Sequence, residues 1–265
     1  MPMLPVGDTE LYYEDEGAGV PIVFSHGLLW SGRMYRAQVA ALRDGFRCVT
    51  FDHRGQGRSK TSPSPYDMET LADDAARLID ALKLGPCHFV GLSMGGFVGL
   101  RLALRRAELL RSLTLIDSAA DPEPRLNVPK YAVMEWLSRR LGMRMLVPSV
   151  MRIMFGRAFL RDRARAGLRA EQAAELASLQ PDRMRAALDS VVRRQPVTHG
   201  LGSIATPTLV LHGADDRAIV LPRAQKMAAA IPGAQLLVIP RAGHTSTVEE
   251  PEAISRELRR FVEVH

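Results

Sequence analysis

The stretch from residue 87 to 106, CHFVGLSMGGFVGLRLALRR, constrains the fold of this chain more than any other. A short apolar run passes through Gly-Leu-Ser-Met-Gly-Gly at residues 91–96 and continues with apolar residues at helical density. This pattern predicts a strand, a tight turn and a helix, with Ser93 at the apex of a nucleophile elbow. A side chain at Gly91 or Gly95 would collide with its neighbours where the backbone turns so sharply. An ordinary glycine-rich turn with a solvated serine is the alternative.

Strand and helix patterns alternate on both sides of this turn. Besides the turn itself, apolar runs predict buried strands at residues 11–13, 21–24, 46–51, 113–117, 208–211 and 235–239. Apolar periodicity predicts helices at residues 33–43, 66–84, 221–231 and 249–264. The alternation is typical of a parallel sheet that helices cover on both faces, and such sheets bind ligands at the carboxyl ends of their strands.

The alternation stops between residues 120 and 196. This segment predicts several helices and no convincing strand, and Pro-containing turns bracket it. The sheet pattern resumes after it. We therefore expect one α/β core formed by residues 1–119 and 197–265, with residues 120–196 inserted as a helical cap over the active site.

Three side chains that could form a catalytic triad follow predicted strands, in the order Ser93, Asp215 or Asp216, and His244. A serine hydroxyl is a weak nucleophile near neutral pH and needs a base within hydrogen-bond reach. The imidazole of His244 titrates in the useful range, and a carboxylate beside it would hold its tautomer. The order serine, acid, histidine is the one expected on an open α/β sheet. The alternative is that His244 is a loop histidine with no catalytic role.

A His-Gly pair, His26 and Gly27, follows the predicted strand at residues 21–24. Such a loop can donate one backbone N–H to an oxyanion hole. The donor here would be Leu28, and the second N–H would come from Met94, the residue after the nucleophile. A strand-to-helix turn with a structural histidine is the alternative.

The loop DHRGQGRS at residues 52–59 combines flexible glycines with charged side chains. We expect its charges to hold the loop in place through ion pairs and hydrogen bonds. Nucleotide binding is not expected, because no Lys-Ser/Thr pair follows and no helix begins directly after the loop.

Taken together, the motifs resemble those of the α/β-hydrolase superfamily, and within it small serine esterases and lactonases similar to 3-oxoadipate enol-lactonases. The matching segments are HGLL at 26–29, DHRGQGRS at 52–59, GLSMGG at 91–96, HGADD at 212–216 and AGHTSTVEEPE at 242–252. The resemblance implies the α/β-hydrolase fold: a mostly parallel twisted sheet, helices on both faces and an inserted helical cap. It also implies that Asp216, three residues after Gly213, is the acid.

The activity that this resemblance implies is serine hydrolysis. A carboxylic ester or lactone of a small, largely apolar substrate would be cleaved through an acyl-enzyme on Ser93. The same triad serves perhydrolases, C–C bond hydrolases and lyases, which remain alternatives, and a ligand receptor without catalysis is a further one.

The substrate pocket is expected under the cap. We predict that Trp30, Met145 and Met154 contribute to it, because methionine adapts to irregular apolar cavities. The basic cap suggests that Arg139, Arg140 or Arg144 binds a substrate carboxylate, as an enol-lactone acid would require. Solvent-facing arginines are the alternative.

The distribution of charge bears on whether the chain binds nucleic acid. The chain carries +6 with a pI near 9.7, but residues 121–195 hold 15 Lys and Arg against 8 Asp and Glu. No aromatic-basic motif accompanies this excess, so we expect solvated helix faces and no nucleic-acid partner. No apolar run of about eighteen residues predicts a membrane span.

The remaining expectations concern compartment, cofactor and assembly. The N-terminal residues lack a basic region followed by an apolar core, so no secretory signal is expected. Cys48 and Cys87 each lie in a predicted buried strand, which favours free thiols and a reducing, cytoplasmic compartment. No metal-ligand spacing is visible, and the predicted mechanism needs no metal or cofactor. Both a monomer and a homodimer are compatible with the sequence.

Overall fold

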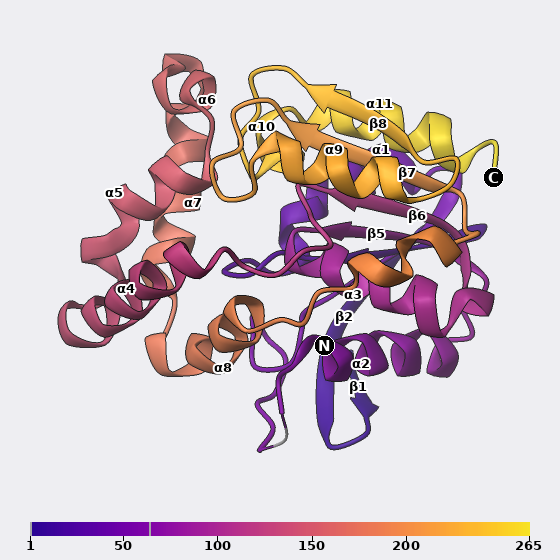
Figure 1. Ribbon diagram of the computed structural model, residues 1–265, viewed down its shortest axis with the longest axis horizontal. Helices are drawn as coiled ribbons and strands as arrows, with labels where there is room; N and C mark the ends of the chain where they lie inside the picture. Colours follow the sequence, from indigo (N-terminus) through magenta and orange to yellow (C-terminus); the bar gives the residue numbers. More distant parts are fainter. Residues whose placement is uncertain (1, 64) are drawn as a thin grey trace.

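An eight-stranded sheet forms the centre of the molecule (Figure 1). The computed structural model describes residues 2–63 and 65–265. Its strands lie in the order β1-β2-β4-β3-β5-β6-β7-β8. They are β1 Met3–Val6, β2 Thr9–Glu16, β3 Val20–Ser25, β4 Phe46–Phe51, β5 Cys87–Leu92, β6 Leu110–Ile116, β7 Thr208–Gly213 and β8 Gln235–Ile239. Strand β2 pairs antiparallel with β1 and β4, and the other neighbours are parallel, so the predicted mostly parallel sheet is confirmed.

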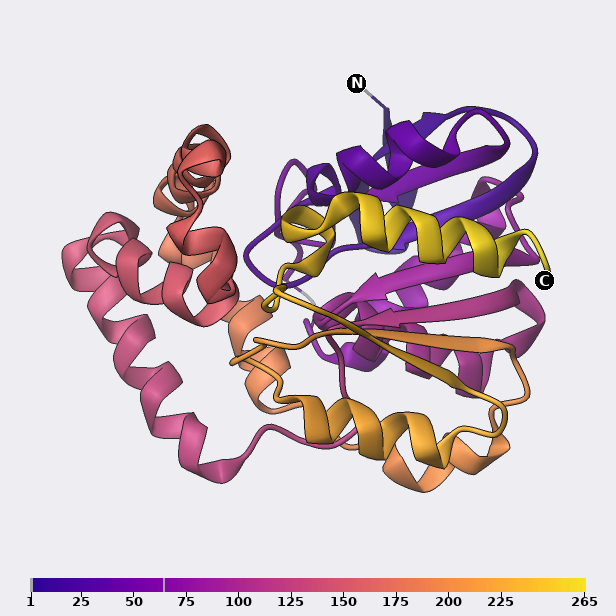
Figure 2. The same ribbon diagram turned by 90° about the horizontal axis from the view of Figure 1, so that it is seen from above.

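Helices cover both faces of this sheet (Figure 2). Outside residues 120–196 they are η1 Gly32–Tyr35, α1 Arg36–Leu42, α2 Met68–Ala81, α3 Met94–Arg105, η2 Ala107–Leu109, η5 Thr198–Ser203, α9 Leu221–Ala230, α10 Ser246–Glu249 and α11 Pro251–Val262. Helices α2, α3 and α9 pack on one face, and α1 and α11 pack on the other. In β5, Cys87 and Phe89 join the first core, whereas Val90 and Leu92 join the second. A central strand buried on both sides is typical of a covered parallel sheet.

Between β6 and β7 the described residues form helices and no strand. Besides η5 they are η3 Arg125–Asn127, α4 Val128–Leu141, α5 Met143–Met154, α6 Arg157–Arg161, η4 Arg163–Arg165, α7 Ala166–Ser178 and α8 Pro181–Val192. Figures 1 and 2 show α4–α7 beyond the end of the sheet toward which the parallel strands point. The predicted inserted helical segment is confirmed, and all of these helices except η5 fall within residues 120–196.

Contacts of several kinds attach the inserted helices to the core. The indole N–H of Trp30, in the loop after β3, donates to Oε1 of Gln172 on α7 at 3.0 Å, and both side chains are buried. The Trp30 ring also meets Phe155 edge-on, with 6.2 Å between ring centroids. At the base of the insertion the Val197 amide donates to the Ala120 carbonyl at 3.0 Å. The segment that leaves the core and the segment that re-enters it therefore lie side by side.

The DHRGQGRS loop is held by its own charges. Asp52 accepts hydrogen bonds from the amides of Gly32 at 2.7 Å and Arg58 at 2.8 Å. The buried guanidinium of Arg54 donates twice to Asp74 on α2, at 2.6 and 2.7 Å. These contacts confirm the structural role that the sequence predicted for this loop.

Two expectations from composition have structural counterparts. Cys48 and Cys87 are free and buried, as predicted, and burial raises the pKa of each thiol to about 12. Both thiols are therefore protonated and unreactive near neutral pH. Among the described residues, no helix combines the length and the apolar character that crossing a membrane requires.

Candidate active site

Ser93 lies between β5 and α3 in a strained backbone conformation, with φ 52° and ψ −110°. A positive φ is costly for a residue with a Cβ and persists only where the surroundings enforce it. A Cβ at Gly91 would lie 2.2 Å from the Gly95 carbonyl oxygen, and one at Gly95 would lie 2.0 Å from the Ser25 carbonyl oxygen of β3. These two glycines allow the strands and the helix to approach, and the resulting turn projects the Ser93 hydroxyl.

The Ser93 hydroxyl begins a chain of hydrogen bonds. Its Oγ lies 2.9 Å from Nε2 of His244, and Nδ1 of His244 lies 2.8 Å from Oδ2 of Asp216. An ionised carboxylate only accepts, so the proton lies on Nδ1 and Nε2 is the acceptor for the serine proton. The three residues follow β5, β8 and β7, and all are buried. The structure thus brings together the three side chains that the sequence selected.

Asp216, and not its neighbour Asp215, contacts the imidazole. Oδ1 of Asp216 accepts from the amides of Ala218 at 2.8 Å and Ile219 at 2.9 Å. Because both oxygens have partners, the carboxylate is fixed in the orientation that meets the ring.

The charge of His244 is set by opposing effects. Burial disfavours the imidazolium, but the carboxylates of Asp216, Asp117 and Glu249 outweigh burial, so the pKa of His244 lies above its ordinary value. The imidazolium of His244 therefore persists to a higher pH than that of an ordinary histidine. The neutral form, which can accept the serine proton, increases as the pH rises.

A second buried carboxylate, Asp117 at the end of β6, lies close to Asp216. It accepts from the Gly213 amide at 2.7 Å and from the Ser246 hydroxyl at 2.6 Å. Burial, and after it the charge of Asp216, raises the pKa of Asp117 well above its ordinary value. Asp117, His212 and Asp216 offer possible metal-ligand atoms within 4.8 Å of one another. Both carboxylates already accept hydrogen bonds from the protein, so the cluster fits a polar network that supports the triad better than an open metal site.

The loop that carries His244 is bonded to the inserted helices. Glu249 of α10 accepts from the Gly156 amide, just after α5, at 2.7 Å and from the Thr245 hydroxyl at 3.0 Å. The Thr245 amide donates to the Met154 carbonyl at 3.1 Å. Burial raises the pKa of Glu249 to about 7, although its hydrogen bonds act in the opposite direction.

Leu28 and Met94, the predicted oxyanion donors, come from segments that adjoin Ser93. A Cβ on Gly27 would lie 3.6 Å from Cβ of Ser93, so the loop that contains Leu28 lies against the elbow. Met94 is the first residue of α3, and amides of the first helical turn have no acceptor inside the helix. Neither amide donates to another described residue. Two backbone donors are therefore free beside the serine.

Ser93 and His244 line a cavity of about 180 Å³ between the elbow and the inserted helices. The lining is largely apolar and includes Leu29, Phe97, Met134, Met143, Met154 and Met184. An apolar protein cavity of about 150 Å³ accommodates benzene. The space therefore suits a small ligand with an apolar body.

The predicted pocket residues are only partly brought together. Met154 lines the cavity, whereas Trp30 and Met145 are not among the described residues that line it. Trp30 is buried, but its ring packs on Phe155 and its N–H is used by Gln172. Met145 lies on the outer side of α5, where its side chain is 66% exposed. The described lining of this cavity therefore includes one of the three predicted side chains.

The three arginines predicted to bind a carboxylate also lie outside this cavity. Arg139, Arg140 and Arg144 are exposed on α4 and α5, and Arg139 pairs with Asp182 at 3.3 Å. For these residues the alternative of solvent-facing arginines is the one that the structure supports.

Charged residues that the sequence did not single out also line the cavity, among them Glu123 and Arg194. These two are 71 positions apart and form a buried ion pair, with Nη1 of Arg194 3.2 Å from Oε2 of Glu123. No local pattern could mark them, because the two segments meet only where the insertion leaves and rejoins the core.

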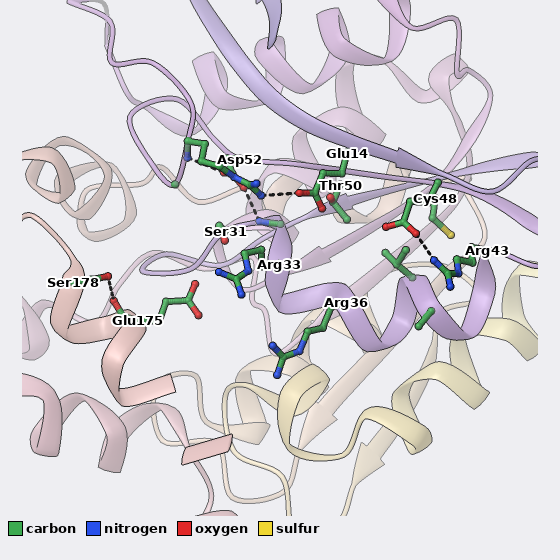
Figure 3. Close-up of a pocket in the computed structure, with 16 residues that line it drawn as sticks. Glu14, Ser31, Arg33, Arg36, Arg43, Cys48, Thr50, Asp52, Glu175 and Ser178 are labelled. Atoms are coloured by element: carbon green, nitrogen blue, oxygen red, sulfur yellow. Dashed lines mark hydrogen bonds and ion pairs between the residues drawn. The ribbon is translucent and has the colours of Figure 1, made fainter. Parts of the chain in front are cut away.

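A second cleft, of about 520 Å³, lies between the core and α7 and has a charged lining. Figure 3 shows Arg33, from η1, pointing toward Glu175 on α7 across it. Other lining charges are paired within the cleft, such as Arg43 with Glu16 at 2.6 Å. None of its described lining residues is a histidine. Although this cleft is larger than the cavity at Ser93, it lacks a nucleophile with an adjacent base.

Comparisons with known proteins agree with this geometry. Residues 20–251 match the family model described as "alpha/beta hydrolase fold". A protein of Pseudomonas syringae pv. syringae (strain B728a) named "Putative carbamate hydrolase RutD" is 31% identical over 249 residues, which cover 91% of this chain and 93% of that protein. A solved thermophilic esterase from Thermogutta terrifontis, with malate bound, has a TM-score of 0.91 at 29% identity and covers 99% of this chain and 98% of its own.

An enol-lactonase from Burkholderia xenovorans LB400 has a TM-score of 0.90 at 28% identity, covering 99% of this chain and 100% of its own. The predicted similarity to esterases and enol-lactonases is thereby confirmed.

Proposed function

The chain belongs to the α/β-hydrolase fold family, and from this premise we propose that it is a serine hydrolase of small carboxylic esters or lactones. The observation that carries the proposal is the continuous hydrogen-bond chain from Ser93 through His244 to Asp216 at the wall of an apolar cavity. Relatives and structural neighbours named as esterases, an enol-lactonase and carbamate hydrolases support hydrolysis as the reaction class.

In the proposed mechanism Nε2 of His244 removes the hydroxyl proton of Ser93 as Oγ attacks the scissile carbonyl carbon. The C–O bond to the leaving alkoxide then breaks, and the imidazolium returns the proton to that oxygen. A water molecule, deprotonated by the same nitrogen, attacks the acyl-enzyme and releases the acid and Ser93. Asp216 holds the ring and stabilises its charged form in both steps.

The tetrahedral intermediates carry a negative oxygen. We assign its stabilisation to the amides of Leu28 and Met94, because both are free and both adjoin Ser93. A preorganised backbone donor of this kind is worth about 2.7–4 kcal/mol in the transition state.

A carbamate is a second candidate for the substrate class. Curated relatives named for carbamate hydrolysis, 31% identical to this chain, favour it. The same triad could attack a carbamate carbonyl, and the cavity size limits either class to small substrates.

The first test is hydrolysis of a series of p-nitrophenyl esters of increasing acyl length by the purified protein and its Ser93→Ala variant. We expect turnover of short acyl chains by the wild type and a loss of about 10⁶-fold in kcat for Ser93→Ala. Ser203→Ala, an exposed serine on η5, is the matched control and should behave as wild type.

Activity that survives Ser93→Ala would contradict the proposal. A wild-type protein inert toward esters, lactones and small carbamates, but able to bind one of them tightly, would favour the receptor alternative.

A further inference from the structure

A buried ion pair interrupts the largely apolar lining of the cavity. Glu123 precedes η3 and Arg194 follows α8, so the pair lies where the insertion leaves and rejoins the core. Their side chains are only 4% and 2% exposed, and both residues line the cavity that contains Ser93.

The guanidinium of Arg194 is incompletely satisfied. Nη1 donates to Oε2 of Glu123 at 3.2 Å and to the Val191 carbonyl at 2.7 Å. Nε and Nη2 are buried and have no partner among the described residues. A buried N–H without an acceptor is costly and rare, so it indicates an acceptor that the protein itself does not supply.

The two unpaired nitrogens are a matched set. Nε–H and the nearer Nη2–H lie on the same edge of the planar guanidinium, the edge that takes a carboxylate through two parallel hydrogen bonds. The plane itself is held by Phe97, whose ring centroid lies 4.2 Å from the Arg194 carbon Cζ. The Phe97 amide in turn donates to the Ser93 carbonyl at 3.0 Å. The guanidinium thus packs on a side chain that lines the same cavity as the nucleophile.

The surrounding charge favours an anion. Glu123 is shared among several donors, because it also accepts from Asn127 at 2.8 Å and lies 3.8 Å from Arg223. The charged groups that line the cavity, His244 aside, are Lys130, Arg185, Arg194 and Arg217 against Glu123 and Glu135. An excess of cations around a cavity with low-dielectric walls attracts negatively charged ligands.

We propose that Arg194 is a substrate-recognition residue that binds, through Nε and Nη2, a carboxylate carried by the substrate at a distance from the bond that is cleaved. This inference rests on the proposed function and narrows it: the substrate is a small ester or lactone with an apolar body and an anionic end. A purely structural alternative is that Arg194 only closes the base of the insertion by pairing with Glu123.

The test compares two substrates that differ in charge alone, monoethyl glutarate and its neutral amide analogue, ethyl glutaramate, by titrating the acid released. We expect the wild type to prefer the anionic ester in kcat/KM. Arg194→Gln should reduce the ratio of the two kcat/KM values by about 10- to 100-fold, mainly through KM of the anionic ester. Arg140→Gln, on an exposed cap arginine, should leave that ratio at its wild-type value.

Glu123→Gln separates recognition from structure. It breaks the same ion pair but keeps the arginine, so recognition by Arg194 predicts that the preference for the anionic ester is retained or increased. If Glu123→Gln and Arg194→Gln reduce turnover of both esters alike, the structural alternative holds and the inference fails. A wild type that prefers the neutral ester would also overturn it.

Binding measured without turnover distinguishes failure of this inference from failure of the proposed function. In calorimetric titrations with glutarate and with glutaramide, the wild type should bind glutarate more tightly even if neither ester is hydrolysed, and Arg194→Gln should lose that difference. Should Arg194→Gln fail to fold, equal affinity of the wild type for the two compounds overturns the inference, and selective binding that Glu123→Gln retains supports it.

Discussion

At the residue scale, the site depends on where one proton lies. Asp216 accepts the hydrogen from Nδ1 of His244, which leaves Nε2 facing Ser93. The same carboxylate favours the charged ring and is a main reason that the pKa of His244 lies above its ordinary value despite burial. One contact therefore sets both the tautomer and the pH at which the base becomes available.

This contact predicts the pH dependence of turnover. For the wild type, kcat/KM on a short ester should rise with pH through a midpoint above about 6.5, the ordinary pKa of histidine. Asp216→Asn should move the midpoint to lower pH, because the negative partner is lost, and should lower kcat by about 10⁴-fold. Asp215→Asn is the matched control and should leave both the midpoint and kcat unchanged. A pH profile that Asp216→Asn does not shift would contradict this account of His244.

The same scale shows what could be predicted from sequence. Ser93, His244 and an acid at Asp215 or Asp216 could be predicted because each follows a strand within a short motif, and parallel strands deliver their carboxyl ends to one edge. The choice of Asp216 depended on the family resemblance. The pair of Glu123 and Arg194 could not, because it forms across the whole insertion. Within α5, the helical spacing of the buried Met143, Leu146 and Val150 leaves Met145 off the face that lines the cavity.

At the element scale, the inserted helices depend on contacts that cross long sequence distances. Trp30 reaches Gln172, 142 residues away, through a buried hydrogen bond of 3.0 Å. This bond joins the loop after β3 to α7, and the loop after β3 also carries Leu28 of the proposed oxyanion hole. The position of the insertion and the conformation of the loop after β3 are therefore linked.

Substitutions of the two tryptophans of the chain test the contact between the loop after β3 and α7. Trp30→Phe preserves an aromatic ring against Phe155 but leaves Oε1 of Gln172 buried without its donor, so we expect a loss of about 1–3 kcal/mol in the free energy of unfolding. Trp136→Phe, at a side chain 58% exposed on α4, should change it by no more than about 0.5 kcal/mol. Urea unfolding of both variants measures the difference. Equal stability of the two variants would show that the hydrogen bond between Trp30 and Gln172 does not stabilise the folded protein.

Most elements could be predicted from local patterns, since apolar runs and helical periodicity reflect burial on a covered sheet. Strand β1 was missed because it is only four residues long and contains Pro5, which removes one backbone donor. Such a residue is tolerated because β1 is the edge strand and pairs on one side only, with β2.

At the scale of the whole molecule, buried ionisable groups link stability to pH. Glu249 has a pKa of about 7 in the folded protein, above its ordinary value near 4.5. The folded state therefore holds a proton that the unfolded state releases between these two values. The contribution of Glu249 to stability is greatest at low pH and is lost as the pH rises from about 4.5 to about 7.

The pH-dependent contribution of Glu249 should appear when the free energy of unfolding is compared with that of Glu249→Gln, whose side chain cannot titrate. The free energy of unfolding of the wild type, relative to the variant, should fall by at most about 3 kcal/mol between pH 4.5 and pH 7 and then level off. Buried histidines such as His88, whose pKa burial lowers to about 4, act in the opposite sense, but they are common to both proteins and cancel. Urea unfolding across this range measures the difference, with the exposed Glu252→Gln as control. A difference independent of pH would contradict the assignment.

The bonds between the His244 loop and the segment after α5 bear on how such insertions can be exchanged between relatives. The Met154 carbonyl accepts from the Thr245 amide, and the Gly156 amide donates to Glu249. A Cβ on Gly156 would lie 2.9 Å from the Gly243 nitrogen. Residues 154–156 of the insertion thus support the loop that carries His244. A chimera that replaces the insertion as one cassette would also replace part of the histidine's support. New specificities are better grafted onto α4 and α8, with residues 154–156 left in place.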